Sequence, residues 1–138
     1  MKTTPCPCES GQPYTRCCGP LLAGESAAGS AEALMRSRYT AFSRRDAAYL
    51  LRTWHAGTRP ATLELDENPA PRWIGLRILS RSQAADDRAT VEFVARYRVG
   101  GRARRLHENS RFIREGGLWY YVDGDIDGDS PAQEEPRP

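Results

Sequence analysis

The chain has 138 residues, of which 39% are hydrophobic and 28% are charged, and its formal net charge is +2. These proportions exclude a disordered or fibrous protein and predict one soluble domain with at most a small appendage. No apolar run approaches the roughly 18 residues that a membrane span needs, and the first ten residues lack the apolar stretch of a signal peptide. We therefore expect a cytoplasmic protein with no membrane partner.

All four cysteines lie near the start of the chain, as Cys6-x-Cys8 and, eight residues later, Cys17-Cys18. In a reducing compartment, clustered thiols are more often metal ligands than disulfides. A disulfide within either pair would close a very small, strained ring, and one between the pairs would need an oxidising compartment. Four thiolates match the tetrahedral coordination of zinc and leave no open position for water. We therefore predict that these four cysteines hold one structural zinc ion.

The residues around the cysteines form a first segment, 1–22, with too few large apolar side chains for a core of its own. The metal would therefore supply most of its folding free energy. A second segment, 28–123, begins with helices: Ser30 is suited to cap one helix, and Asp46 a second, shorter one. Three prolines within residues 57–72 then indicate an irregular loop.

From Trp73 onward the hydrophobic period changes to two, which indicates strands. Turn signals at residues 84–87, at Gly100-Gly101 and at Gly116-Gly117 divide this stretch into about four strands. Helices followed by an antiparallel meander predict an α+β domain with the helices on one face of the sheet. His107 and Glu108 are neighbours on the third strand, so their side chains should point to opposite faces.

The end of the chain, residues 124–138, is acidic and contains prolines, and we expect a disordered tail. The acidic residues between Asp123 and Glu134 also have the spacing of a calcium-binding EF-hand loop. Such a loop lies between two helices, whereas this segment follows a strand. An acidic tail is therefore the better interpretation.

The first segment resembles the SEC-C motif, C-x-C-x8-C-[HC], in its cysteines, in Ser10-Gly11 and in Tyr14. This motif is best known as the zinc-binding tail of the preprotein translocase ATPase SecA. The chain as a whole is similar to the YchJ-like family, over residues 35–42, 49–50, 53–55, 58–60, 110–112 and 119–124. The resemblance implies a nuclear-transport-factor-2-like domain, in which N-terminal helices and a curved antiparallel sheet form a cone with a cavity.

Several polar and aromatic residues are candidates for the wall of this cavity. They are Tyr39, Trp54, His55, Arg59, Tyr97, His107, Glu108 and Ser110. Because strand residues alternate between faces, Glu108 and Ser110 share one face and His107 lies on the other. A catalytic pair of His107 with Glu108 is therefore not expected. For three of these residues a role without a ligand is the favoured interpretation: His55 at the end of a helix, His107 on a strand surface and Arg59 in solvent.

These features predict a protein-interaction module, in which a zinc-stabilised motif docks on another protein. The resemblance to the SecA tail makes the export or translation machinery a candidate partner. An enzyme or small-molecule binder that uses the cavity is the alternative. A weaker alternative is nucleic-acid or ribosome binding through arginines on the polar side of the first helix and near the third strand. These arginines are Arg36, Arg38, Arg44, Arg45, Arg102, Arg104 and Arg105. The nearly neutral net charge argues against nucleic acid.

Overall fold

The computed structural model describes residues 4–63, 65 and 71–131, the last five of these by their backbone alone. A 3-10 helix, Tyr14–Arg16, leads into the helices α1 (Cys18–Leu22), α2 (Ala31–Arg44) and α3 (Ala47–Arg52). One antiparallel sheet follows, with its strands in chain order. The strands are β1 (Arg72–Ala85), β2 (Arg88–Val99), β3 (Arg102–Glu115) and β4 (Leu118–Pro131).

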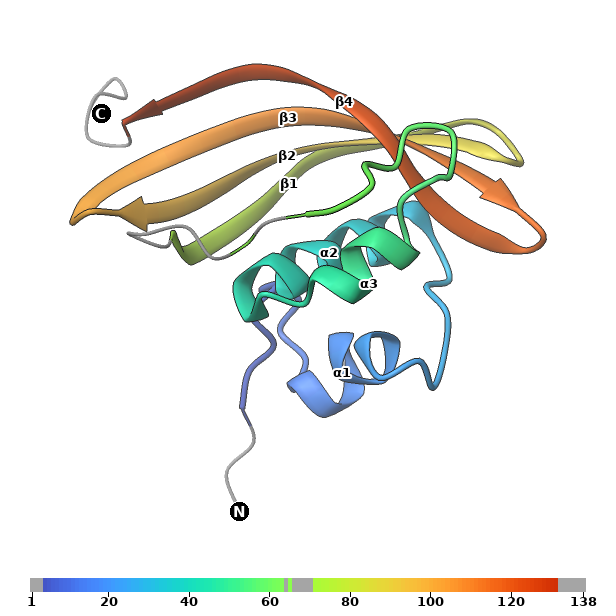
Figure 1. The fold of residues 1–138 in the computed structure, drawn as a ribbon, viewed down its shortest axis with the longest axis horizontal. Coiled ribbons are helices and arrows are strands. Elements are labelled where there is room, and N and C mark those ends of the chain that lie inside the picture. The colour runs from blue at the N-terminus through green and yellow to red at the C-terminus, as the bar shows by residue number, and fades with distance from the viewer. Residues whose placement is uncertain (1–3, 64, 66–70, 132–138) are drawn as a thin grey trace.

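The helices lie on one side of the curved sheet (Figure 1). Helix α2 runs beneath the concave face and contacts β1, β2 and β4, while α1 lies on the side of α2 away from the sheet. The expected α+β cone, with N-terminal helices on a curved sheet of four strands, is thus confirmed. None of the helices within the described ranges has the length and apolar character needed to cross a membrane.

Both predicted helix starts are confirmed. The Ser30 hydroxyl accepts a hydrogen bond from the backbone N–H of Ala33 at 3.0 Å, and Asp46 Oδ1 accepts one from the backbone N–H of Tyr49 at 3.0 Å. Each cap satisfies an N–H group that the helix itself leaves unpaired. Arg45, with φ 59°, adopts a left-handed conformation after α2 and lets the chain turn directly into α3.

The predicted turns are also confirmed. Gly100 and Gly101 have φ values of 57° and 78° and join β2 to β3, with Val99 paired to Arg102 across the turn. A two-residue turn of this hand needs positive φ at both positions, and glycine adopts it without strain. In the predicted 57–72 loop, the described residues 57–63, 65 and 71 lie in neither a helix nor a strand, and Arg72 already begins β1.

The structure corrects the prediction of a disordered tail that begins at residue 124. Strand β4 continues to Pro131, and the backbone of residues 124–131 pairs with β3 from Ser110 back to Arg104. Arg111 of β3 donates hydrogen bonds to two residues of β4, to Asp123 at 2.6 Å and to Asp125 at 2.8 Å. Acidic residues that resembled a tail or a calcium loop are therefore cross-strand partners of an arginine. The rest of the expected tail, residues 132–138, lies outside the described residues.

Candidate metal centre and cavity

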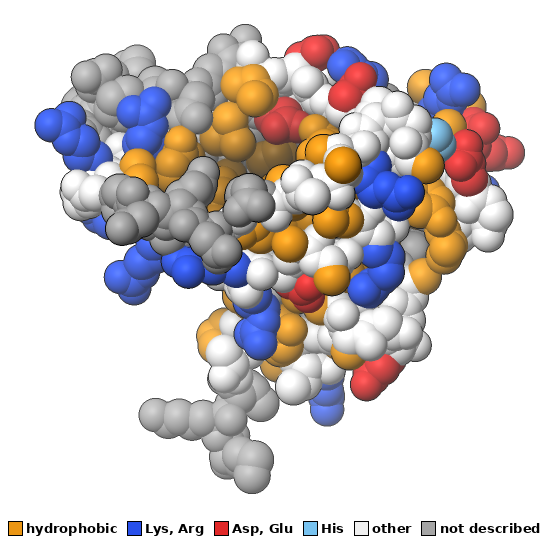
Figure 2. All heavy atoms as spheres, viewed as in Figure 1, with side chains coloured by type: hydrophobic (Ala, Val, Ile, Leu, Met, Phe, Trp, Pro, Cys, Tyr) orange, Lys and Arg blue, Asp and Glu red, His pale blue; other side chains and the backbone are white. Residues whose placement is uncertain are grey.

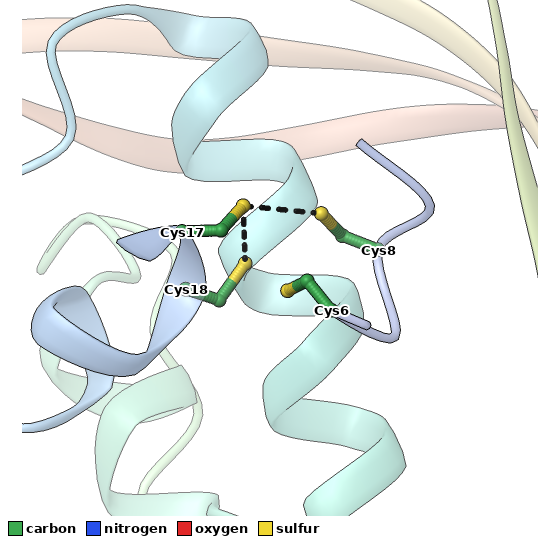
Figure 3. A group of neighbouring side chains, drawn as sticks. All are labelled: Cys6, Cys8, Cys17 and Cys18. Carbon is green, nitrogen blue, oxygen red and sulfur yellow. Dashed lines mark hydrogen bonds between the residues drawn. The ribbon is translucent and has the colours of Figure 1, made fainter. Parts of the chain in front are cut away.

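The sulfur atoms of the four cysteines converge on one point (Figure 3). Cys6 and Cys8 come from the segment before the 3-10 helix, and Cys17 and Cys18 from the start of α1, with α2 behind them. All four sulfur atoms lie within 4.8 Å of one another, and that of Cys17 is 3.5 Å from Cys8 and 3.9 Å from Cys18. Tetrahedral coordination with bonds of about 2.3 Å separates sulfur atoms by about 3.8 Å. The cluster therefore fits one tetrahedral metal ion.

Neighbouring groups hold the two cysteine pairs in this arrangement. The Ser10 hydroxyl lies 3.1 Å from Cys17 Sγ and accepts a hydrogen bond from the backbone N–H of Gln12 at 3.2 Å. Arg36 of α2 donates a hydrogen bond to the carbonyl oxygen of Cys8 at 2.7 Å. A methyl group at Gly19 would lie 2.8 Å from the carbonyl oxygen of Tyr14, so the turn into α1 requires glycine. These contacts explain why a serine and a glycine accompany the cysteines.

Neighbouring groups shift the pKa values of Cys8, Cys17 and Cys18 in different directions. Hydrogen bonds from Cys18, and then from Ser10 and Cys17, lower the pKa of Cys8 to about 4 despite its burial. The same hydrogen bond to Cys8, together with burial, raises the pKa of Cys18, and burial raises the pKa of Cys17. Because like charges repel, the Cys17 and Cys18 thiols keep their protons until a cation compensates the charge. A bound dication would supply that compensation.

The cluster belongs to the main hydrophobic core. Cys8 is fully buried, and Cys6, Cys8 and Cys18 share one cluster of buried side chains with Leu34 of α2 and Phe93 of β2. A metal here would tie the N-terminal segment to the helix that faces the sheet. Four thiolate ligands would leave no coordination position open for a substrate.

A cavity of about 230 Å³ lies between α2 and the concave face of the sheet. Hydrophobic side chains are visible inside a hollow on the face shown in Figure 2. The cavity walls come from α2, from the segment after α3 and from all four strands. The lining residues are Met35, Arg38, Tyr39, Phe42, Trp54, Trp73, Phe93, Ala95, Leu106, Glu108, Ser110, Phe112 and Tyr121.

Arg38 is the buried cation of this wall, with only 5% of its surface exposed. Its guanidinium carbon lies 5.1 Å from the ring centre of Trp54 and 4.5 Å from that of Tyr121, and both rings attract a cation. Its Nη1 donates hydrogen bonds to the Leu50 carbonyl at 2.8 Å and to the Thr53 hydroxyl at 2.7 Å. Within the described part of the chain, no acceptor is found for its Nε and Nη2. Burial lowers the pKa of Arg38 to about 10, so it stays charged at neutral pH.

Glu108 is the acidic group of the same wall. Its Oε2 accepts hydrogen bonds from the Ser110 hydroxyl at 2.7 Å and from the Tyr121 hydroxyl at 3.2 Å. Its Oε1 has no hydrogen-bond partner among the described residues. Burial, and then the nearby carboxylate, raise the pKa of Tyr121, so this hydroxyl remains a donor at neutral pH.

Aromatic rings form much of the remaining wall. Trp73 contacts Tyr39 and Phe42, with ring centres 5.8 Å and 5.9 Å apart. The Trp54 ring meets that of Tyr121 edge to face at 5.2 Å, and its Nε1 is buried without a partner in the described structure. An unpaired buried donor is costly, so this indole N–H is an unsatisfied polar group in the wall.

The structure divides the residues that the sequence proposed for the pocket. Tyr39, Trp54, Glu108 and Ser110 line the cavity, whereas the other four candidates do not. His107 lies on the opposite face from Glu108, as the strand alternation predicts, and its Nε2 is 2.7 Å from Glu92 Oε2.

The remaining three candidates also lie elsewhere, which corrects the expected pocket. His55 Nε2 is 3.1 Å from Glu115 Oε1, where the chain leaves α3 and runs along β4. Arg59 is exposed in the loop that follows. The Tyr97 ring contacts Trp73 from outside the cavity, with ring centres 4.9 Å apart.

Arg38 is the main residue that the sequence interpretation misplaced, because we expected it on the polar side of the helix. Its position was nevertheless encoded: Arg38 lies four residues after the buried Leu34 and four before the cavity residue Phe42, on one helix face. Two other arginines of α2 are also engaged, since Arg36 binds the Cys8 carbonyl and Arg44 stacks on the Tyr14 ring at 4.6 Å. The arginines of α2 therefore do not form one basic surface.

Comparisons with known proteins agree with this architecture. Residues 30–124 match the YchJ middle NTF2-like domain, and residues 3–20 match the SEC-C motif. A UPF0225 protein of Ralstonia nicotianae is 53% identical over 134 residues, which cover 90% of this chain and 92% of that protein. A UPF0225 protein of Streptomyces coelicolor is also 53% identical, over 91% of this chain and 98% of its own.

Two solved structures share the fold. The solution structure of a SEC-C motif containing protein from Rhodopseudomonas palustris has a TM-score of 0.79 and 38% identity, and covers 92% of this chain and 100% of that one. The crystal structure of such a protein from Psychrobacter arcticus has a TM-score of 0.73 and 26% identity, over 99% and 89% of the two chains. The chain therefore belongs to the UPF0225 family of YchJ-like proteins, which join a SEC-C motif to an NTF2-like domain.

Proposed function

We propose that this protein binds a small organic molecule in the cavity between α2 and the sheet. The buried guanidinium of Arg38 supports this proposal most directly. Removing such a charge from water costs several kcal/mol, and apolar residues of similar volume often stabilise a core at least as well. Arg38 lines the cavity, and its Nε and Nη2 have no acceptor among the described residues, so these two groups are free to bind a ligand there.

The size and lining of the cavity indicate the scale of that ligand. Pockets for drug-sized molecules measure roughly 300–1,000 Å³, and this cavity, at about 230 Å³, is smaller. Its wall is mostly aromatic and aliphatic, with a few polar groups that converge near Tyr121. We therefore expect a compact molecule with one flat or apolar part and one polar group.

Binding is favoured over catalysis by the placement of the histidines. Both His55 and His107 contact carboxylates outside the cavity. Among the described cavity residues, Glu108 therefore has no histidine partner for acid–base chemistry. A carrier, sensor or storage role fits this wall better than a hydrolytic or isomerising one.

We further propose that the metal of the cysteine cluster is zinc and that it is structural. Four thiolates in a tetrahedron are a ligand set typical of structural zinc. The burial of the cluster against α2 suggests that the ion stabilises the helix that carries Arg38 and Tyr39. Docking of the SEC-C motif on another protein stays a prediction.

Amide NMR of the zinc-loaded protein, titrated with aromatic fragments of at most about fifteen heavy atoms, tests ligand binding. We expect some fragments to shift the amides of cavity residues on β2 and β3, and Ala95→Phe, which fills the cavity, to abolish these shifts. Ala95→Leu is a milder filling variant should Ala95→Phe fail to fold. If no fragment shifts these amides, or if the shifts persist in the filled variant, the proposal is wrong.

A further inference from the structure

On the basis of the proposed function, we infer that the cavity selects a neutral aromatic amide, or a heterocycle with the same amide-like edge. An aromatic carboxylate and an aromatic amine are the charged molecules that it would reject. The two opposite charges in the wall, and the hydrogen-bonding atoms that each leaves unused, point to this class of ligand.

Arg38 and Glu108 both line the cavity but do not form an ion pair with each other in the described structure. Arg38 keeps two nitrogen groups, Nε and Nη2, as donors without a described acceptor. Glu108 keeps Oε1 as an acceptor without a described donor, because Ser110 and Tyr121 both bind Oε2. The wall therefore offers unused donors and an unused acceptor at the same time.

Tyr121 holds these two groups in one part of the cavity. Its ring lies 4.5 Å from the guanidinium carbon of Arg38, and its hydroxyl donates to Glu108 at 3.2 Å. Arg38 and Glu108 are therefore both neighbours of Tyr121, and our inference is that one polar group of a small ligand meets both of them. The rings of Tyr39, Phe42 and Trp73 remain for the flat part of the ligand.

The charges of Arg38 and Glu108 decide among the polar groups that a ligand could present. A carboxylate would accept hydrogen bonds from Arg38 but would bring a like charge near Glu108, and an ammonium group would do the reverse. An amide carbonyl accepts from Arg38 while its N–H donates to Glu108 Oε1, and the net charge of the cavity stays unchanged. The amide is therefore the group that satisfies both partners without repulsion.

Three probes with the same ring and different head groups test this inference: benzamide, benzoate and benzylamine. Each is titrated into the zinc-loaded full chain at neutral pH, and affinity is measured from amide NMR shifts. We expect benzamide to bind at least about tenfold more tightly than either charged probe, because each charged probe leaves one wall group unpaired.

Two variants should change this order in opposite directions. Glu108→Gln removes the repulsion between Glu108 and the benzoate carboxylate, and should raise the affinity for benzoate about tenfold. Arg38→Met removes the cation, and should raise the affinity for benzylamine and lower the affinity for benzamide. Should Arg38→Met fail to fold, Arg38→Lys keeps the charge and should lower benzamide affinity by losing the planar fork. Glu92→Gln is the matched control, since Glu92 pairs with His107 on the outer face and should leave all three affinities unchanged.

The outcomes separate the inference from the proposed function. If benzoate or benzylamine binds the wild-type protein more tightly than benzamide, the inference is wrong and the cavity is still a binding site. The same holds if only fragments without an amide-like edge bind. If no fragment of any class shifts the cavity amides, both the inference and the proposed function are overturned.

Discussion

The carboxylate of Glu108 lies directly against the backbone of Gly124, so closely that a methyl group at residue 124 would overlap Oε2. Gly124 stands opposite Ser110 on the neighbouring strand, and Ser110 donates the hydrogen bond that orients the same carboxylate. Gly124, one residue beyond the predicted end of the domain, thus leaves the space that the Glu108 carboxylate occupies in the cavity wall.

We predict that Gly124→Ala displaces the Glu108 side chain. The overlap should lower the free energy of unfolding by about 1 kcal/mol, at the low end for overpacking, because the Glu108 side chain can turn toward the cavity. Because Oε1 of Glu108 would move, the affinity for benzamide should fall as well. Chemical denaturation measures the first effect, and the NMR titration measures the second.

Two controls separate overlap from a general cost of removing glycine. Gly29→Ala should be neutral, since a methyl group there meets no atom within 4 Å. In a Glu108→Ala background, Gly124→Ala should lower the free energy of unfolding much less, because the overlapping carboxylate is gone. Equal costs in the two backgrounds would show that the Glu108 contact does not explain the loss.

Metal removal should destabilise the whole domain and not the N-terminal segment alone. At free zinc a thousandfold above its Kd, binding contributes about 4 kcal/mol, which a strong chelator should remove. Cys8→Ser should lower the melting temperature in the same way and make it insensitive to the chelator. Because the cluster shares its core with Leu34 and Phe93, amides of α2 and β2 should also lose protection from hydrogen exchange. Exchange changes confined to residues 4–22 would contradict a shared core.

Shortening β4 should weaken the sheet. A chain that ends at residue 123 loses the pairing of residues 124–131 with β3, together with the hydrogen bond from Arg111 to Asp125. Its melting temperature should fall by about 5 °C or more relative to a chain that ends at Pro131, which keeps every described pairing. Hydrogen exchange should become faster at residues 104–110. Identical melting curves for the two chains would contradict a structural role for this part of β4.

Alkaline pH should reveal the burial of Tyr39. Burial, and then the nearby Glu9 carboxylate, raise the pKa of Tyr39 to about 12, whereas an unfolded tyrosine titrates near 10. The folded state thus keeps a proton that the unfolded state loses, so stability from this group is complete below about pH 10 and falls as pH rises toward 12. Relative to Tyr39→Phe, the wild-type protein should lose stability between about pH 10 and 11 in denaturant titrations. A constant difference between the two proteins across this range would show that the hydroxyl is not shielded.

Short-range signals in the sequence were sufficient for several parts of this protein. The cysteine spacing predicted a cluster that fits a metal because its ligands lie within one short segment, whose local turns bring them together. Ser30, Asp46 and the Gly100-Gly101 turn were predicted for the same reason, since a cap or a tight turn depends on residues three or four positions apart. Strand alternation likewise separated His107 from Glu108.

Only the tertiary structure decided what the cavity contains. The spacing of Arg38 from Leu34 and Phe42 places it on the inner face of α2. Its partners Trp54 and Tyr121 come from other elements, and the helical spacing does not predict them. The acidic end of the chain forms a strand because β3 provides a partner backbone and Arg111 provides opposite charge. The position of the Glu108 carboxylate depends on the absence of a side chain at Gly124 of the neighbouring strand. The sequence by itself determined the cysteine cluster and the order of the elements, whereas the cavity wall arose from contacts between residues distant along the chain, which local pattern does not encode.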